Sequence, residues 1–378
     1  MNKKLLILVV FGASTILLGG MSSTVLIGTQ YTATKSGYFF SIAPWWNTSW
    51  SYRKLIFINH SQVDSDLNSF PILVNITDTD LRDDAQDDGD DISFVICDGF
   101  NIQLNHEIEY YDNTSGKLVA WVNVTSISSS RSTAIYMYYG NSGCSSQENI
   151  TGVWDANYTM VQHLNESSGT LFDSTNNDND GYNIGAEYTA TAKIAGGYDF
   201  ADTQKDYINI SDNPSLNITK SLTISTWIKT SALSQQARIV TKGKAANNAY
   251  ILNACLNSND KPYFSIWDEG VKQSANSNYV ITDNVWHYVV GTFNGSQIEI
   301  YIDSELNNTA EYIGDIDTVS TNLAIPCYEQ APSNYFEGII DEVRISNTAR
   351  STAWISTSYN TMHNTSTFLI IQNEEIQS

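Results

Sequence analysis

Residues 286–303 read WHYVVGTF, then NGS, then QIEIYID. In the last of these pieces, three isoleucines between Gln297 and Asp303 alternate with polar side chains. A strand turns successive side chains to opposite faces, so the alternation predicts a strand with one buried aliphatic face. Asn294-Gly295 between the two apolar runs favours a tight primed turn in which both residues take positive φ. The stretch therefore predicts a β-hairpin at the centre of an all-β domain.

The composition indicates a globular chain with an acidic surface. The 378 residues are 42% hydrophobic and 16% charged, which is enough for about two domains. There are 19 basic and 41 acidic side chains, and the net charge is −22. Such a surface repels the phosphates of nucleic acids and anionic lipid headgroups, and it attracts cations. We therefore expect no nucleic-acid partner.

The N-terminal segment, residues 1–34, has the pattern of an export signal. A short basic start (MNKK) precedes a run from Leu5 to Thr34 without a charged residue. The apolar part is slightly long for a cleaved signal and close to the ~20 residues that span a bilayer. Two interpretations stay open, an uncleaved membrane anchor behind an apolar helix and a signal cleaved after Ser22. In both, the body of the protein lies outside the cytoplasm.

Glycosylation sequons support this location, although an Asn-, Ser- and Thr-rich chain also makes sequons by accident. All of them follow the apolar segment. The asparagines are Asn47, Asn59, Asn75, Asn113, Asn123, Asn149, Asn157, Asn165, Asn209, Asn217, Asn294, Asn307 and Asn364.

Four cysteines fall two in each half of the chain, and no pair has the CxxC spacing of a zinc or redox site. They are Cys97, Cys144, Cys255 and Cys327. Outside the cell, one disulfide in each half is the natural pairing. Buried thiols are the alternative, since cysteine is a good small core residue.

The first folded region reads as a small β-sandwich built from short apolar runs. Examples are Phe70–Val74, Leu118–Val122 and Thr133–Tyr139, with no long helix-period segment between them. The segment WWNTSWSYRK at 45–54, the acidic DGDDI and the closing IYMYYGN resemble a domain of unknown function found in archaeal and bacterial envelope proteins. The resemblance covers residues 44–145.

A linker, residues 146–158, precedes the second domain. The runs that follow, among them YDF at 198–200, LTISTWIK at 222–229, the opening hairpin and FEGIIDEVRI at 336–345, resemble a LamG-like, concanavalin A-like jelly roll of the laminin-G and pentraxin superfamily. The resemblance spans residues 159–375. The fold class is therefore all-β, with two β-sandwiches. This superfold hosts lectins, adhesion modules, glycosidases and inert spacers, so it does not fix a function.

The sequence contains no complete motif that is typical of a catalytic site. A retaining glycosidase needs two carboxylates about 5 Å apart, and laminarinase-type relatives carry them as Glu-x-Asp-x-Glu. No strand has that pattern; Glu299–Asp303 comes nearest, and Glu107-Ile108-Glu109 lacks the middle Asp. There is no Gly-x-Ser-x-Gly elbow, and the five histidines are scattered. We expect a protein without enzymatic activity.

Calcium is the expected cofactor, because hard cations take carboxylate and amide oxygens. Pentraxins hold calcium with an Asp-Asn pair and a Glu-Gln-Asp run. The matching positions here are Asn247, Asn248, Glu329 and Gln330, with Asn247 in place of an acid and Ala331 in place of the last Asp. Two polar rim loops are the alternative. In calcium-binding relatives the Asp that corresponds to Asp341 can hold a structural ion; alternatively, Asp341 caps the strand or pairs with Arg344.

Carbohydrate recognition needs aromatic platforms beside polar side chains. Tyr263, Trp267 and Tyr328 lie near the candidate calcium loops and supply such platforms. The expectation is a non-catalytic protein on the extracellular face of an archaeal or bacterial envelope. It is membrane-anchored or secreted, and it binds a glycan or a surface protein in adhesion or recognition. A structural envelope or filament subunit and a glycoside hydrolase are the alternatives.

Overall fold

The chain divides into two compact units, Met1–Pro44 and Trp45–Ser378. The computed structural model describes residues 31–33, 39–41, 44–97, 101–201, 204–233, 236–244, 247–255, 260–327 and 335–378. In the first unit, β1 (Tyr31–Ala33) pairs antiparallel with β2 (Phe39–Ser41). The expected N-terminal apolar helix falls largely on residues 1–30, outside the described residues.

None of the helices in the described part of the chain combines the length and the apolar character needed to cross a bilayer.

The second unit begins with the expected small β-sandwich. One sheet has the strand order β26-β3-β9-β5-β6, and the other has the order β4-β8-β7. The strands are β3 (Tyr52–Ile58), β4 (Leu67–Thr77), β5 (Ser93–Ile96), β6 (Gln103–Leu104), β7 (His106–Asp112), β8 (Lys117–Ile127), β9 (Thr133–Tyr139) and β26 (Leu369–Ile376). The single-turn helix α1 (Thr79–Asp84) and the 3-10 turns η1 (His60–Gln62) and η2 (Ile150–Gly152) lie in its connections.

Strand β8 shows why this sandwich does not stand alone. Its run Leu118–Val122 is apolar without interruption, the pattern of a strand that is buried on both faces. Leu118, Ala120 and Val122 pack in the core of the first sandwich. Val119 and Trp121, which point the other way, pack in a second cluster with residues of the following domain.

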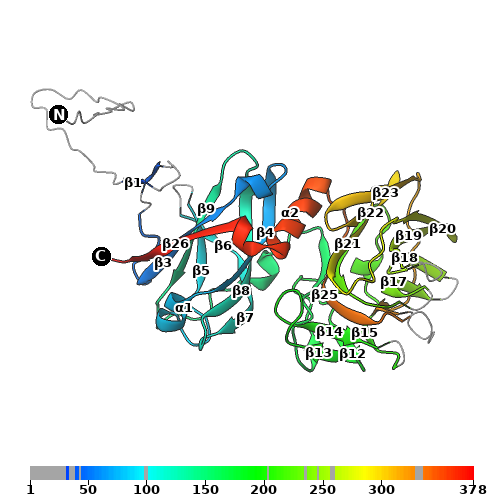
Figure 1. Ribbon diagram of the computed structural model, residues 1–378, viewed down its shortest axis with the longest axis horizontal. Coiled ribbons are helices and arrows are strands. Elements are labelled where there is room, and N and C mark those ends of the chain that lie inside the picture. The colour runs from blue at the N-terminus through cyan, green and yellow to red at the C-terminus, as the bar shows by residue number, and fades with distance from the viewer. Residues whose placement is uncertain are drawn as a thin grey trace, which may run out of the picture. The chain divides into compact units, whose positions relative to one another are not determined.

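The jelly roll follows, with two larger sheets (Figure 1). The first has the order β13-β14-β25-β16-β21-β22-β23, with β10 also paired to β25, and the second has the order β11-β12-β15-β24-β17-β18-β19-β20. The strands are β10 (Tyr158–Gln162), β11 (Thr170–Leu171), β12 (Gly181–Ile184), β13 (Glu187–Thr189), β14 (Gly197–Phe200), β15 (Tyr207–Ile210), β16 (Leu222–Lys229), β17 (Arg238–Lys244), β18 (Asn247–Asn253), β19 (Tyr263–Asp268), β20 (Val271–Asn276), β21 (Trp286–Phe293), β22 (Gln297–Ile302), β23 (Glu305–Glu311), β24 (Leu323–Ile325) and β25 (Gly338–Ser346). A 3-10 turn, η3 (Pro214–Leu216), precedes β16.

The predicted hairpin is β21 and β22, and its isoleucines lie in the jelly-roll core. The predicted turn geometry is wrong in one respect, because Gly295 takes a positive φ of 87° and Asn294 does not. Asn294 instead accepts hydrogen bonds through Oδ1 from the backbone N–H groups of Ser296 and Gln297. Tyr301, on the face predicted to be polar and outward, is only 2% exposed.

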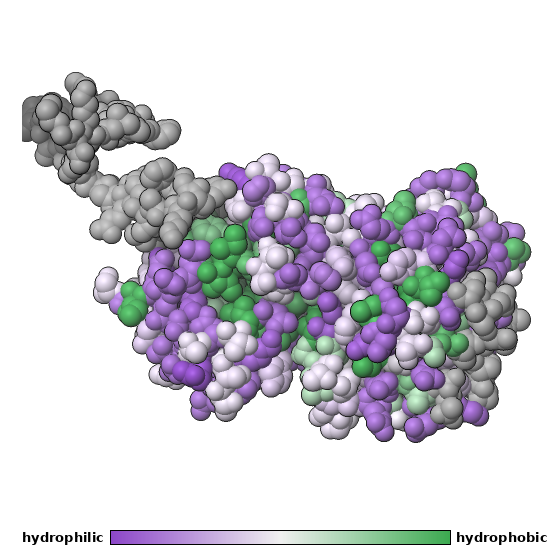
Figure 2. Space-filling view, in the orientation of Figure 1, coloured by the Kyte–Doolittle hydropathy of each residue, from purple (hydrophilic) through white to green (hydrophobic). Residues whose placement is uncertain are grey.

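A shared apolar cluster joins the two sandwiches and explains why Tyr301 is buried. It combines Leu73 and Trp121 of the first sandwich with Trp227 and Tyr301 of the second. Helix α2 (Thr352–His363) contributes Ile355 and Met362, among others. It is capped by Ser351, and Thr361 Oγ1 accepts a hydrogen bond from Leu73 N at 2.9 Å. Figure 2 shows that the hydrophobic side chains left on one face lie in small groups between hydrophilic ones.

The C-terminus returns to the first sandwich after α2 and the short α3 (Thr365–Phe368). Strand β26 pairs with β3, with Leu369 opposite Ile58 and Ile371 opposite Ile56 (Figure 1). The sequence interpretation gave residues up to 375 to the jelly roll, and that boundary differs from the structure. Strand β3 has an apolar edge beside the first core, where Leu369 is buried and the partly buried Ile371 packs against the core.

Candidate buried polar centre

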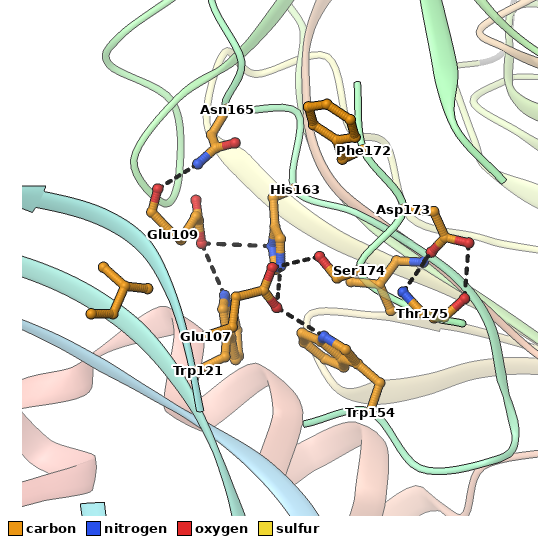
Figure 3. Close-up of polar contacts among 12 residues, drawn as sticks. Glu107, Glu109, Trp121, Trp154, His163, Asn165, Phe172, Asp173, Ser174 and Thr175 are labelled. Atoms are coloured by element: carbon orange, nitrogen blue, oxygen red, sulfur yellow. Dashed lines mark hydrogen bonds and ion pairs between the residues drawn. The ribbon is translucent and has the colours of Figure 1, made fainter. Parts of the chain in front are cut away.

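The most unusual group of side chains lies where the two sandwiches meet (Figure 3). Strand β7 supplies Glu107 and Glu109, and β25 supplies Glu342 and Arg344. His163 follows β10 directly. All five are buried, and the side chains of Glu109 and Glu342 are both 0% exposed. We refer to these five residues as the buried polar centre.

Two local features of the strands aim these side chains at one another. Strand β7 contains a bulge between Ile108 and Tyr110, and Glu107 before the bulge and Glu109 within it both have buried side chains. Strand β25 contains a bulge, because Ser225 and Trp227, two apart, pair with Arg344 and Asp341, three apart. Within it Glu342 takes a φ of +58°. A bulge bends a strand and redirects a side chain, which is why a charged residue here reaches inward.

His163 is the hub of the contacts. Its Nδ1 donates to Glu342 Oε1 at 2.8 Å and lies 3.6 Å from Glu109 Oε2. Its Nε2 lies 3.4 Å from Glu107 Oε2. Arg344 Nε donates to Glu342 Oε2 at 3.1 Å. The histidine thus connects carboxylates from both sandwiches.

Indole and hydroxyl donors complete the surroundings. Trp121 Nε1 donates to Glu109 Oε2 at 2.9 Å, and Trp154 Nε1 donates to Glu107 Oε2 at 3.0 Å. Ser174 Oγ donates to Glu107 Oε1 at 2.6 Å. The guanidinium carbon of Arg344 lies 4.1 Å from the Trp121 ring centre and 4.8 Å from that of Trp154. Cation–π contacts of this kind stabilise a buried cation.

Burial and neighbouring charges shift the pKa values in opposite directions. Burial raises the pKa of Glu109 to about 8, with Glu342 and Glu107 adding to it and His163 opposing it. Burial would also raise the pKa of Glu342, but His163 and Arg344 hold it below its usual range. Burial alone lowers the pKa of His163, but the three glutamates hold it well above 6.5. A buried ion network of this kind is costly to break at one member.

The centre is enclosed, and this limits its chemistry. An open groove of about 790 Å³ lies in the first sandwich beside Lys54, Asp78 and Asp80. A second groove of about 510 Å³ lies at one end of the jelly roll beside Asn177 and Asn347. Neither groove is lined by Glu107, Glu109, His163 or Glu342. Neither of these two grooves brings a polysaccharide to the carboxylates of the centre.

Glu109, His163 and Glu342 could hold a metal ion, because one ligand atom from each lies within 4.8 Å of the others. From the sequence, Glu107 and Glu109 resemble a catalytic carboxylate pattern that lacks its middle Asp. His163 is one of five histidines without a common spacing. Two acids at alternate positions of a strand were the available signal. The partners across the interface are far away in the chain and were not foreseen.

The expected calcium residues are only partly described. Asn247 is exposed and Asn248 is buried on β18 of one sheet, whereas Asp341 lies on β25 of the other. Ile194 N donates to Asp341 Oδ2 at 2.8 Å, and the residue is 0% exposed. Arg344 forms its ion pair with Glu342, and not with Asp341 as the alternative interpretation expected. Glu329 and Gln330 lie outside the described residues.

The expected aromatic platforms differ in exposure. Tyr263 is only 3% exposed, so it presents no ring face to a ligand. Trp267 is half-buried, with the ammonium of Lys272 6.0 Å from its ring centre. Tyr328 lies outside the described residues. Alternation puts Tyr263 and Trp267 on the same face of β19, but it does not tell whether that face is covered.

The structure contains no S–S bond among the four cysteines, all of which lie in its described part. Cys255 and Cys327 are buried, which is the core alternative that the sequence left open. Cys97 and Cys144 are half-buried, and Cys144 Sγ lies 3.3 Å from Asn141 O. Two cysteines that lie in the same half of the sequence are not for that reason close enough in space to form a disulfide. None of the sequon asparagines is buried.

The family comparisons agree with the predicted domain order. Residues 88–181 match a domain of unknown function. Residues 202–356 match the concanavalin A-like lectin/glucanases superfamily. The two matches follow one another along the chain in the predicted order. No curated protein matches the chain.

Several solved structures are similar to part of the chain. The binding domain of Paraclostridial Mosquitocidal Protein 1 is 14% identical, with a TM-score of 0.47 over 55% of this chain and 53% of that one. Domain 4 of AbnA, a GH43 extracellular arabinanase from Geobacillus stearothermophilus in complex with arabinotriose, is 18% identical, with a TM-score of 0.45 over 55% of this chain and 100% of that one. The binding domain of Botulinum Neurotoxin DC in complex with SialylT is 17% identical, with a TM-score of 0.43 over 55% and 52%. The chain thus spans about half the length of the two toxin structures, and scores this low carry no conclusion about its ligand.

Proposed function

We propose that the chain is a non-catalytic, exported cell-surface protein whose jelly roll binds a glycan. The observation that carries the proposal is an exposed row of aromatic and polar side chains on the outer face of the sheet that contains β11, β12 and β15. The match of residues 202–356 to a superfamily of lectins and glucanases is consistent with it.

The row is defined by strand register. Thr170 lies opposite Tyr182, and Tyr182 lies opposite Asn209, so their side chains point to the same face. Leu171 is buried in the core, which turns Phe172 to the outer face as well. Phe172 is 62% exposed and Tyr182 is 54% exposed. The outer row, Thr170, Phe172, Tyr182 and Asn209, therefore presents two rings beside an amide and a hydroxyl.

These groups suit a sugar better than an apolar partner. A ring face packs against the C–H face of a pyranose, while the amide of Asn209 and the hydroxyl of Thr170 bond to its hydroxyl groups. The amide is held in place, because Asn322 Nδ2 donates to Asn209 Oδ1 at 3.1 Å. No carboxylate pair belongs to this row, so it supports binding and not hydrolysis.

A glycan array with the labelled full chain in detergent tests the proposal. We expect at least one binder, and we expect Phe172→Ala combined with Tyr182→Ala to weaken its affinity about tenfold or more, since each ring contributes about 1 kcal/mol. Tyr279→Ala is the matched control, because Tyr279 is 43% exposed outside the row. An array without binders would favour the structural envelope subunit. Reducing-end release that a single carboxylate change abolishes would favour a glycosidase.

Export and calcium remain parts of the proposal. Protease treatment of intact cells should digest the body of an exported, anchored chain. Calcium is proposed for Asn247, Asn248, Glu329 and Gln330, with a weak affinity of roughly 10⁻⁴–10⁻³ M. Millimolar calcium should then raise the melting temperature, and Glu329→Ala should remove the rise. A rise lost only in Asp341→Ala would place the ion at β25 instead.

A further inference from the structure

We propose that Glu109, His163 and Glu342 of the buried polar centre bind one divalent transition-metal ion, which fastens the first sandwich to the jelly roll. This goes beyond glycan binding, because the outer row belongs to a different sheet. Glu109 lies on β7 of one sandwich, whereas Glu342 lies on β25 of the other and His163 directly follows β10 there. An ion held by all three would act as a cross-link between the domains.

The geometry is close to that of a bound ion. His163 Nδ1 lies 2.8 Å from Glu342 Oε1 and 3.6 Å from Glu109 Oε2. Zinc binds nitrogen and oxygen at about 2.0–2.2 Å, so tetrahedral ligand atoms lie about 3.4 Å apart. Small side-chain shifts would bring the three atoms to those positions. Imidazole with carboxylates suits zinc, whereas calcium prefers oxygen ligands alone.

A buried oxygen without a partner points to the missing ligand. Glu109 Oε1 has no hydrogen-bond partner, and the Glu109 side chain is 0% exposed. A buried acceptor atom that is left without a partner destabilises the folded state. Oε2, the atom near His163 Nδ1, accepts the Trp121 N–H, the kind of contact that orients a metal ligand. An ion that Glu109 binds through both oxygens would keep this contact and satisfy Oε1.

Four carboxyl groups, those of Glu107, Glu109, Asp341 and Glu342, are enclosed here. His163 contacts three of them, and Arg344 contacts Glu342. Buried carboxylates are stable when they are paired or coordinate metals. A metal ion bound here would replace the protons that Glu109 and His163 otherwise carry.

Zinc retention by the full chain tests the proposal. The purified protein is incubated with Zn²⁺ alone, passed through gel filtration in high salt, and analysed for metal. We expect about one equivalent of zinc in the wild type and at least a tenfold loss of affinity in Glu109→Gln and in His163→Gln. Glu299→Gln is the matched control, because Glu299 is bonded to Thr292 and Tyr301 away from the centre. It should retain zinc like the wild type.

Cobalt provides a second readout that does not depend on stability. Co²⁺ bound to one imidazole and two carboxylates at this site should give a visible absorption band in the wild type and in Glu299→Gln, and no band in His163→Gln. Folded wild type that retains less than a tenth of an equivalent of zinc would overturn the proposal. Equal zinc retention in wild type, Glu109→Gln and His163→Gln would also overturn it, because the ion would then lie elsewhere on the acidic surface.

Discussion

Leu369 lies opposite Ile58 in the pairing of β26 with β3, and both side chains are buried in the first core. The last strand of the chain thus completes a sheet that the first strand of this sandwich begins. The jelly roll is inserted between two segments of one sheet. Because the same polypeptide enters and leaves it through the first sandwich, we expect the two sandwiches to unfold together.

Substitutions along β26 test this arrangement. Leu369→Ala should lower the free energy of unfolding by about 2–4 kcal/mol, since the side chain is 4% exposed and its loss leaves a cavity. Ile376→Ala in the same strand should cost less than about 0.5 kcal/mol, since Ile376 is 68% exposed. Urea denaturation followed by tryptophan fluorescence gives both values. Equal, small effects would show that β26 is not an integral strand.

The sequence predicted the strands whose pattern is local. The hairpin β21–β22 and strand β8 carry their signal in their own residues. It did not predict α2, because Thr352–His363 is rich in Ser, Thr and Asn, which are weak helix formers. Packing of Ile355 and Met362 into the shared cluster stabilises the helix instead. Strand β26 pairs with a strand from the other end of the chain, and no local pattern specifies that partner.

The buried polar centre could not be predicted from the sequence, because its residues also come together through contacts between distant segments. Glu107 and Glu109 were visible as alternating acids, but His163 and Glu342 join them only through the docking of two domains. The inward direction of Glu342 depends on a bulge in β25, which the run GIIDEVRI does not reveal. By contrast, the jelly roll and its position after the small domain were predicted correctly.

His106 should make the protein sensitive to mild acid. It is 0% exposed, both ring nitrogens lack a hydrogen-bond partner, and burial lowers its pKa to about 4. The unfolded chain takes up a proton near pH 6.5 that the folded chain refuses until about pH 4. This histidine therefore lowers stability as pH falls through that window, by up to about 3 kcal/mol in total.

His106→Leu removes this contribution. Measured by urea denaturation at intervals from pH 7 to pH 4.5, the variant should lose less stability than the wild type as the pH falls. It should also be at least as stable at pH 7, since an unsatisfied buried polar ring is replaced by an apolar side chain. Parallel pH curves for the two proteins would mean that the buried imidazole carries no such penalty.

The cysteines should remain alkylatable without reductant. Because the structure contains no S–S bond among Cys97, Cys144, Cys255 and Cys327, we expect iodoacetamide in denaturant to add four groups to the chain, as counted by intact mass. Under native conditions the buried Cys255 should react far more slowly than the half-buried Cys144, because the reagent reaches it only when the structure opens. Two added groups in denaturant would instead indicate one disulfide, and none would indicate two.

Sequon use in a glycosylating host should follow the availability of each side-chain amide nitrogen. Asn165 Nδ2 donates to Glu109 O at 2.6 Å, and Asn123 Nδ2 donates to Gly152 O and Val153 O. A glycan on either nitrogen would disturb these bonds, which for Asn165 lie beside the buried polar centre. Asn294 is exposed at the tip of the central hairpin and uses Oδ1, not Nδ2, to shape the turn. Peptide mass spectrometry of the folded, exported protein should therefore find Asn294 occupied, with Asn123 and Asn165 bare. Full occupancy at Asn165 in a stable protein would mean that its bond to Glu109 contributes little to the joint between the domains.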